Sequence, residues 1–199
     1  MLLIGYPTGI ETGTRLCLMM YLLLMISSLV SNEVLAIFAL KTVVSHFNKM
    51  GSSVFLASLD ITKAFDSLHH DKLFKCLYKI GLPEPLVEVL CNWYGKLFVS
   101  VCWANSFSYI FTVTSGVRRG GVLSPSLFNV FINVFIVLLR MFNVCCHIHS
   151  VFRGCLLYAD DMILICPSVQ GLPAMLNECV QISSEFALEF NARKSYCML

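Results

Sequence analysis

The sequence predicts an α+β fold in which a small antiparallel sheet carries acidic residues and helices pack on one face of that sheet. Two observations predict this fold class. Short apolar segments of strand-like composition lead to aspartates, and the segments between them repeat apolar residues at helical spacing. A chain of 199 residues, 57% of them hydrophobic, is long enough for one domain with a sizeable core, which excludes a disordered or fibrous protein.

The charge balance is close to neutral, with 14 basic residues against 12 acidic ones and a net charge of +2. Charge alone therefore does not indicate a nucleic-acid partner. The mean hydropathy of +0.77 is high for a soluble domain and is typical of a membrane protein or of a piece of a larger protein. The second explanation fits better, because most apolar runs are interrupted by polar residues.

The first 33 residues form an apolar segment of their own. Its longest uncharged run, residues 16–32, is borderline in length for crossing a bilayer, so it can be interpreted as a signal or an anchor. We expect residues 1–33 to be an atypical apolar leader and residues 34–199 to form the folded domain. A membrane-anchored protein is retained as an alternative.

The folded part begins with a helix and a strand. Apolar residues recur at helical spacing before residue 50, and the Met-Gly-Ser-Ser sequence at 50–53 ends that pattern. Residues 54–61 are short, rich in large apolar side chains and bounded by turn formers, which predicts a buried strand. This strand ends by presenting a carboxylate, Asp60.

Two helices and a hairpin follow. Residues 71–80, and then a segment that opens at Pro85, repeat apolar positions as capped helices do. The period changes to two in residues 97–103 and again in residues 108–114. This alternation predicts a hairpin whose arms are separated by residues 104–107.

A glycine-rich loop connects the hairpin to the next helix, for which Ser124 and Pro125 are expected as N-cap and first residue. Residues 155–166 then form two apolar arms around an acidic centre. The simplest geometry for them is a hairpin with Asp160 and Asp161 at its tip. A further helix and a final strand complete the chain.

Three carboxylates, those of Asp60, Asp160 and Asp161, lie at the ends of otherwise apolar strands. Burying such charges costs several kcal/mol unless something positive compensates them, and these strands contain no Lys or Arg. Oxygen ligands in twos and threes are what Mg²⁺ prefers. The pattern therefore predicts a two-metal site of the kind that catalyses nucleotidyl transfer, rather than strand-end acids that only cap turns.

Four motifs that occur in one order resemble reverse transcriptases, most closely those of LINE-type retrotransposons without long terminal repeats. The motifs are LDITKAFDSLHHDKLF at 59–74, SGVRRGGVLSPSLFN at 115–129, YADD at 158–161 and FNARKS at 190–195. The resemblance covers residues 34–199. Four motifs in order are far more specific than an isolated Y-x-D-D, which occurs often by chance.

The resemblance implies RNA-directed DNA synthesis by nucleotidyl transfer from a dNTP to a primer 3′-hydroxyl. The implied cofactors are two Mg²⁺ ions, or Mn²⁺ in their place, and the implied partners are an RNA template, a DNA primer and dNTP. The implied fold is a polymerase palm with partial fingers and no thumb. By family analogy the protein would act in the nucleus or the cytoplasm.

The resemblance also implies roles for single residues in catalysis. Asp60, Asp160 and Asp161 match the metal ligands, of which Asp160 is the more direct member of the YADD pair. The backbone carbonyl of Ile61 would add a metal ligand next to the nucleotide. Lys194 matches a lysine near the triphosphate and is the candidate proton donor to pyrophosphate.

Phe65 matches the aromatic steric gate that lies under the nucleotide sugar and rejects a 2′-hydroxyl, although a core residue is the alternative interpretation. Other matched positions would contact the nucleotide, namely Arg119, Gly120 and Ala159, or the nucleic acid, namely Arg118 and Tyr158. Arg118 can equally be a solvated surface residue.

The chain departs from the family pattern in three places. Arg119 stands where the family usually has Gln, which exchanges a neutral amide for a cation. Residues 1–33 do not resemble the fingers segment that normally grips the triphosphate, and no thumb is expected after Leu199. A catalytically inactive remnant that acts at most as a nucleic-acid-binding module is therefore a second alternative.

Overall fold

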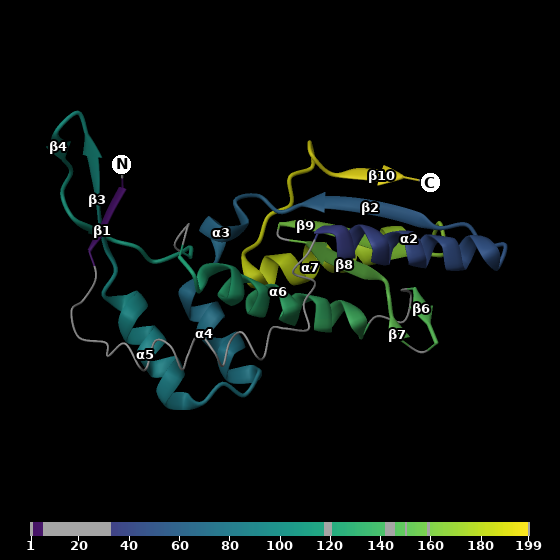
Figure 1. Ribbon diagram of the computed structural model, residues 1–199, viewed down its shortest axis with the longest axis horizontal. Coiled ribbons are helices and arrows are strands. Elements are labelled where there is room, and N and C mark those ends of the chain that lie inside the picture. Colours follow the sequence, from purple (N-terminus) through teal and green to yellow (C-terminus); the bar gives the residue numbers. More distant parts are fainter. Residues whose placement is uncertain are drawn as a thin grey trace.

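A computed structural model describes residues 2–5, 33–117, 121–141, 146–149, 151–158 and 160–198 (Figure 1). The helices are α2 (Glu33–Lys49), α3 (Ala64–Ser67), α4 (His70–Lys79), α5 (Glu84–Gly95), α6 (Ser124–Arg140) and α7 (Gly171–Phe186). The strands are β1 (Leu2–Gly5), β2 (Phe55–Asp60), β3 (Phe98–Trp103), β4 (Ser106–Phe107), β5 (Phe111–Thr112), β6 (His147–Ile148), β7 (Val151–Phe152), β8 (Cys155–Tyr158), β9 (Asp161–Cys166) and β10 (Tyr196–Met198).

The main sheet has the strand order β10-β2-β9-β8, and every neighbouring pair in it is antiparallel. Strand β2 is central and pairs with β9 from Phe55 opposite Cys166 to Asp60 opposite Asp161. The predicted strand at 54–61 is confirmed, since the apolar run of β2 lies inside the sheet. The hairpin β8–β9 is confirmed as well, with its tip at the end of β2.

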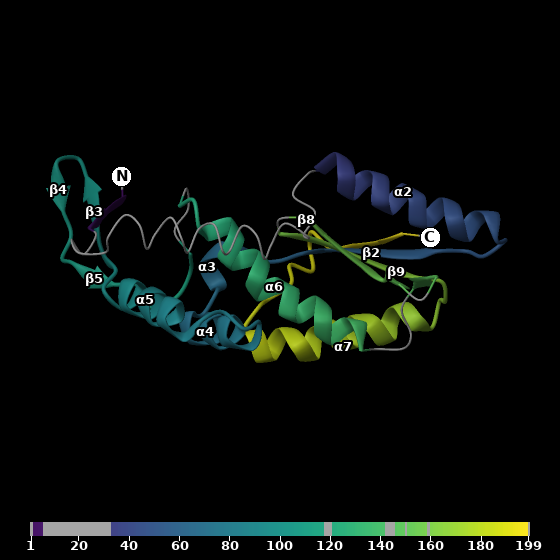
Figure 2. The ribbon, with the colours of Figure 1, turned by 60° about the horizontal axis from the view of Figure 1, so that its bottom comes forward.

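Helices cover both faces of this sheet, so the expectation that they pack on one face is wrong. Figure 2 shows α2 on one side of the sheet and α6 and α7 on the other. Met162 and Leu164 of β9 belong to the large core cluster built with α6 and α7. Ile165, which points to the opposite face, belongs to a second cluster with Val43 of α2. The physical reason is that β9 is apolar at successive positions, so both of its faces need cover.

A second sheet is built around β3, which pairs with β1 and with β4 and β5. The predicted hairpin is confirmed, but its turn is shorter than the expected 104–107, because Trp103 already pairs with Ser106. The two turn residues, Ala104 and Asn105, adopt positive φ of 44° and 68°. Two residues with positive φ suit the twist of a tight hairpin. In Figure 1 this hairpin projects at the end of the molecule remote from the main sheet.

Helix α6 begins one residue earlier than its caps predict. The N–H of Leu127 donates to the carbonyl of Leu123 at 2.9 Å, which makes Leu123 the N-cap. Ser124 is therefore the first helical residue, and Pro125 occupies the first turn, where its missing N–H costs nothing.

Within the ranges given above, no helix is long and apolar enough to cross a membrane. The run at 16–32, on which the anchor interpretation rests, lies outside the described residues, as does most of the segment 1–33.

Candidate active site

The ends of β2 and β9 bring the predicted carboxylates to one place. Asp60 is the last residue of β2 and Asp161 is the first residue of β9, and the two are direct cross-strand partners. Asp160 precedes Asp161 in the tip of the β8–β9 hairpin, and its carbonyl accepts a hydrogen bond from the N–H of Ile61 at 3.3 Å. Three acidic residues that are separated by up to 101 positions thus lie together where the central strands β2 and β9 end. We call this end of the sheet the carboxylate edge.

The negative charges at this edge act on one another. The pKa of the Asp161 carboxyl is raised above its ordinary value, first by desolvation and then by repulsion from Asp160 and Asp60. Lys194 opposes this shift through attraction. Desolvation is the largest of these influences and the neighbouring carboxylates add to it, so the ionised form of Asp161 is disfavoured where it lies. A carboxyl perturbed in this way is a candidate for a functional site.

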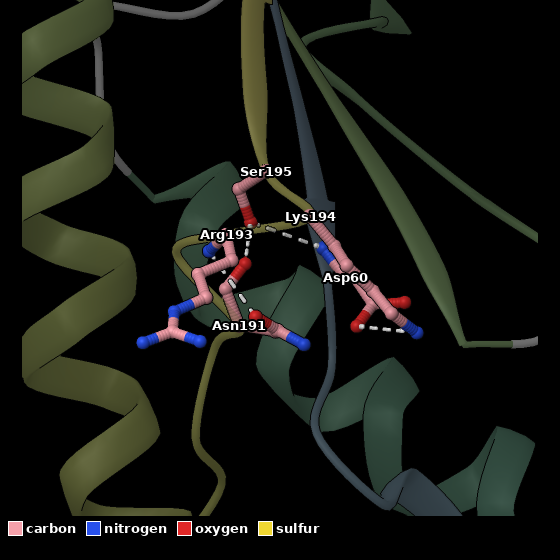
Figure 3. Close-up of polar contacts among 5 residues, drawn as sticks. All are labelled: Asp60, Asn191, Arg193, Lys194 and Ser195. Atoms are coloured by element: carbon pink, nitrogen blue, oxygen red, sulfur yellow. Dashed lines mark hydrogen bonds and ion pairs between the residues drawn. The ribbon is translucent and has the colours of Figure 1, made fainter.

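The predicted proton donor lies next to the first carboxylate. Lys194 Nζ is 3.8 Å from Asp60 Oδ2, an approach that Figure 3 draws. The lysine side chain is 68% exposed and the aspartate side chain 19% exposed, so the lysine can leave the pair at little cost. The charge compensation that the apolar strands lack therefore comes from a distant segment of the chain.

A turn formed by residues 191–195 carries Lys194 and binds the main chain of Asp60 (Figure 3). The N–H of Asn191 donates to the carbonyl of Asp60 at 2.9 Å. The N–H of Asp60 donates to the hydroxyl of Ser195 at 3.3 Å, and that hydroxyl donates to the carbonyl of Asn191 at 2.8 Å. Ser195 and Asn191 were not among the predicted site residues.

The segment after β2 leads from the carboxylates to the predicted steric gate. Ile61 is buried and forms an isolated bridge with Phe190. In this bridge the N–H of Thr62 donates to the carbonyl of Glu189, and the N–H of Asn191 donates to the carbonyl of Asp60. Neither of these two hydrogen bonds uses the carbonyl oxygen of Ile61. Phe65 lies in α3, half-buried, with its ring 4.8 Å from that of Phe128. One side of the Phe65 ring is therefore packed while the residue keeps some exposure.

The start of the glycine-rich loop is held tightly against this same segment. Gly116 has φ +89°, and its N–H and carbonyl bind the carbonyl of Leu68 and the ring of His70, at 2.7 and 2.8 Å. The next N–H, that of Val117, donates to the carbonyl of Phe65 at 2.7 Å. The glycine-rich composition of the loop predicts a turn near Gly116. The spacing of residues in the sequence does not predict that this turn contacts the segment with Leu68 and His70.

Tyr158 ends β8 and is the cross-strand partner of Asp161. Both residues line an apolar cavity of about 160 Å³ between the β8–β9 hairpin and α2, together with Ile37 and Ile163. Four other predicted positions, namely Arg118, Arg119, Gly120 and Ala159, lie outside the described residues. The structure therefore brings together Asp60, Asp160, Asp161, Tyr158 and Lys194, with Ile61 and Phe65 on the adjoining segment.

The donor set is the kind that a hard divalent cation takes, because it consists of carboxylate oxygens whose mutual repulsion a cation would relieve. Within the described part of the chain, no three His, Cys, Asp or Glu side chains are arranged so that they could hold a metal ion as they stand. Asp60 is turned toward Lys194 instead. The residues fit the cation in type and in strand position, and side-chain rotation would have to complete the set.

The family model described as reverse transcriptase (RNA-dependent DNA polymerase) matches residues 14–199. A Pol polyprotein from the type-2 retrotransposable element R2DM of Drosophila melanogaster is 29% identical over 154 residues, which are 77% of this chain and 14% of that protein. The Pol polyprotein of an R2 element from Nasonia vitripennis is 28% identical over 146 residues, which are 73% of this chain and 14% of that protein. The chain thus spans about a seventh of the length of these relatives.

Solved structures agree on the fold. Apo telomerase from Candida Tropicalis, truncated from its C-terminal domain, superposes with a TM-score of 0.71 at 14% identity and covers 94% of this chain and 40% of that one. Telomerase from Candida albicans in complex with a fragment of telomeric RNA gives a TM-score of 0.69 at 13% identity, covering 94% and 34% of the two chains.

Proposed function

This chain belongs to the reverse transcriptase (RNA-dependent DNA polymerase) family, and from that premise we propose that it catalyses RNA-directed DNA synthesis. The reaction is nucleotidyl transfer from a dNTP to the 3′-hydroxyl of a DNA primer paired with an RNA template. Its relatives are R2 non-LTR retrotransposon Pol polyproteins, as the motif order predicts. The main sheet with its carboxylate edge is the proposed palm, within a reverse transcriptase-like domain at 34–199.

One observation carries the proposal, namely the direct pairing of Asp60 with Asp161 at one edge of the sheet, with Asp160 beside them. Strand ends that meet in this way are an unfavourable place for three carboxylates unless a cation joins them. The raised pKa of Asp161 reflects that unfavourable arrangement. A structural role alone would be served better by neutral residues of similar size.

The proposed metal ligands are the three aspartates and the carbonyl oxygen of Ile61. When bound there, two Mg²⁺ ions would lower the pKa of the attacking hydroxyl and stabilise the departing pyrophosphate. Lys194 would hold a proton at Nζ beside the same edge and donate it to the leaving group. Its exposed side chain is free to move from Asp60 toward a triphosphate.

The remaining residues have proposed roles in recognition. Phe65 would contact the nucleotide sugar with the part of its ring that Phe128 leaves uncovered. Tyr158, the partner of Asp161, would contact the nucleic acid close to the carboxylates. Further proposed contacts come from the family resemblance alone, namely Arg119, Gly120 and Ala159 to the nucleotide and Arg118 to the nucleic acid.

Primer extension tests the proposal. The chain is incubated with a DNA primer annealed to an RNA template, dNTPs and Mg²⁺, and incorporation is compared with that of the Asp160→Asn variant. We expect the variant to lose activity by at least about a hundredfold, because one metal-binding carboxylate is removed. Glu88→Gln, which removes an exposed carboxylate on α5, is the matched control and should retain activity. Equal incorporation by wild type and Asp160→Asn would remove the metal assignment.

A further inference from the structure

The ladder between β10 and β2 ends two residues before Asp60. Its last pair is Tyr196 opposite Ser58, and the residues preceding β10 form the turn at 191–195 instead of continuing the ladder. Asp60 lies two residues further along β2, where it has no strand partner on the β10 side but still pairs with Asp161 of β9 on the other side. A side chain takes over at this point, because the N–H of Asp60 donates to the hydroxyl of Ser195 instead of to a backbone carbonyl.

The hydroxyl of Ser195 is itself fixed in orientation. It donates its own proton to the carbonyl of Asn191 at 2.8 Å, so its lone pairs are directed toward the N–H of Asp60 (Figure 3). The N–H of Asn191 in turn donates a hydrogen bond to the carbonyl of Asp60. The N–H of Arg193 donates to the side-chain oxygen of Asn191 at 3.1 Å and so stabilises the turn. Both main-chain groups of Asp60 on this side are thus held by one turn.

We infer that Ser195 is a positioning residue for Asp60, and that it sets the direction in which the Asp60 carboxylate leaves the sheet. The inference rests on the proposed function, because it takes Asp60 to be a metal ligand. A hydroxyl suits this place since it can accept one hydrogen bond and donate another at the same time. Metal ligands must be held to within about half an ångström, and outer residues that orient them affect metal affinity strongly.

A purely structural role for Ser195 makes a different prediction. If its hydroxyl only stabilised the turn before β10, replacing it would lower the free energy of unfolding and leave metal affinity unchanged in the folded protein. If Ser195 positions Asp60, replacing it with Ala should lower metal affinity in the folded protein. Replacing it with Thr, which keeps the hydroxyl, should leave metal affinity close to that of the wild type. Affinity and stability are therefore measured separately on the same variants.

The experiment measures Mn²⁺ binding to the full chain by electron paramagnetic resonance, with thermal unfolding and primer extension run in parallel. The variants are Ser195→Ala and Ser195→Thr, and the matched control is Ser184→Ala, whose hydroxyl donates only within α7 to Gln181. We expect Ser195→Ala to weaken Mn²⁺ binding by about tenfold. We expect Ser195→Thr to restore most of the affinity and Ser184→Ala to match the wild type.

The outcomes separate this inference from the proposed function. Mn²⁺ binding by Ser195→Ala at wild-type affinity would overturn the inference, and so would an equal loss in Ser195→Thr. Should Ser195→Ala fail to fold, the Mn²⁺ affinity of Ser195→Thr decides, since an affinity close to that of the wild type is expected and a loss of about tenfold would overturn the inference. A wild-type chain that binds Mn²⁺ but incorporates no dNTP would contradict the proposed function alone. A wild-type chain that binds no Mn²⁺ at millimolar concentration would overturn both.

Discussion

At the scale of single residues, Asp161 is ionised at the expense of the folded state. Its pKa is raised by desolvation, then by Asp160 and Asp60, relative to the ordinary value of 3.8. When the pKa of a carboxyl is higher in the folded than in the unfolded protein, the free energy of unfolding falls as the pH rises through the folded pKa. The protein is still less stable for this reason at neutral pH. Grouping the negative charges at the carboxylate edge therefore lowers the free energy of unfolding of the metal-free protein.

Asp161→Asn should accordingly stabilise the metal-free protein at pH 7. We expect the Tm in EDTA to rise by only roughly 1–3 °C, because Asp161 is exposed and solvent partly screens the repulsion that Asp160 and Asp60 exert on it. At a pH below the ordinary carboxyl value the difference should vanish, since both proteins are then neutral at this position. The exposed Glu88→Gln should leave the Tm unchanged, and a fall in Tm for Asp161→Asn would show that its charge is already compensated.

Phe65 allows a test of nucleotide choice. If its ring lies under the sugar, Phe65→Val should raise the incorporation of ribonucleotides relative to deoxyribonucleotides by about tenfold or more. The measurement is competitive primer extension with rNTP and dNTP. Phe74→Val removes a half-buried aromatic of α4 that packs on Tyr94 instead, and should leave the ratio unchanged. Equal ratios in both variants would make Phe65 a core residue.

At the scale of elements, the contact between α3 and the glycine-rich loop depends on a missing side chain. A Cβ on Gly116 would lie 3.1 Å from the Cα and the carbonyl oxygen of Asp66, and the residue has positive φ. Gly116→Ala should lower the free energy of unfolding by about 2–4 kcal/mol, since strain and overpacking add. Gly81 has a similar φ of +80° but open space around it, so Gly81→Ala should lose only about 1–2 kcal/mol. Urea unfolding measures both, and equal losses would exclude the packing contribution.

The same contact makes stability depend on pH through His70. Burial is the largest influence and lowers the pKa of His70 below its ordinary value of 6.5, while the bond to Gly116 and the charge of Asp71 act in the opposite direction. The unfolded chain therefore takes up a proton at a higher pH than the folded one, and stability falls as pH falls below about 6.5. His70→Gln should flatten this dependence between pH 7 and 5 in urea unfolding, and an unchanged dependence in the variant would show that His70 is not its source.

The elements that could be predicted from sequence are those that local composition specifies. The apolar run of β2 ending at Asp60 and the two arms around Asp161 are visible in the sequence, and each became a strand. The bond between Asp60 and Ser195 joins residues 135 positions apart, and no spacing rule connects a serine to the end of a distant strand. Gly116 could be recognised as a turn residue, but its close approach to Asp66 arises only when the elements have packed.

At the scale of the whole molecule, the main sheet separates two cores of unequal size. The cluster on the α6 and α7 side contains most of the buried apolar residues, including Val130. The cluster under α2 has Val43, Cys146 and Ile165 as its fully buried members. Helix α2 also leaves Ile37 and other apolar side chains exposed. We therefore expect α2 to be held less firmly than the rest of the domain and to open separately.

Two valines of equal burial test this expectation, since Val43 and Val130 are each 3% exposed. Each Val→Ala change removes the same atoms and should lose about 1–3 kcal/mol of local packing. Val130→Ala should lower the free energy of global unfolding and speed hydrogen exchange throughout the sheet. Val43→Ala should speed exchange mainly in α2 and lower the global value less, because α2 opens before the larger core does. Uniformly faster exchange in Val43→Ala would instead mean that α2 and the sheet unfold as one unit, and mass spectrometry of peptides from α2 and α6 distinguishes the two results.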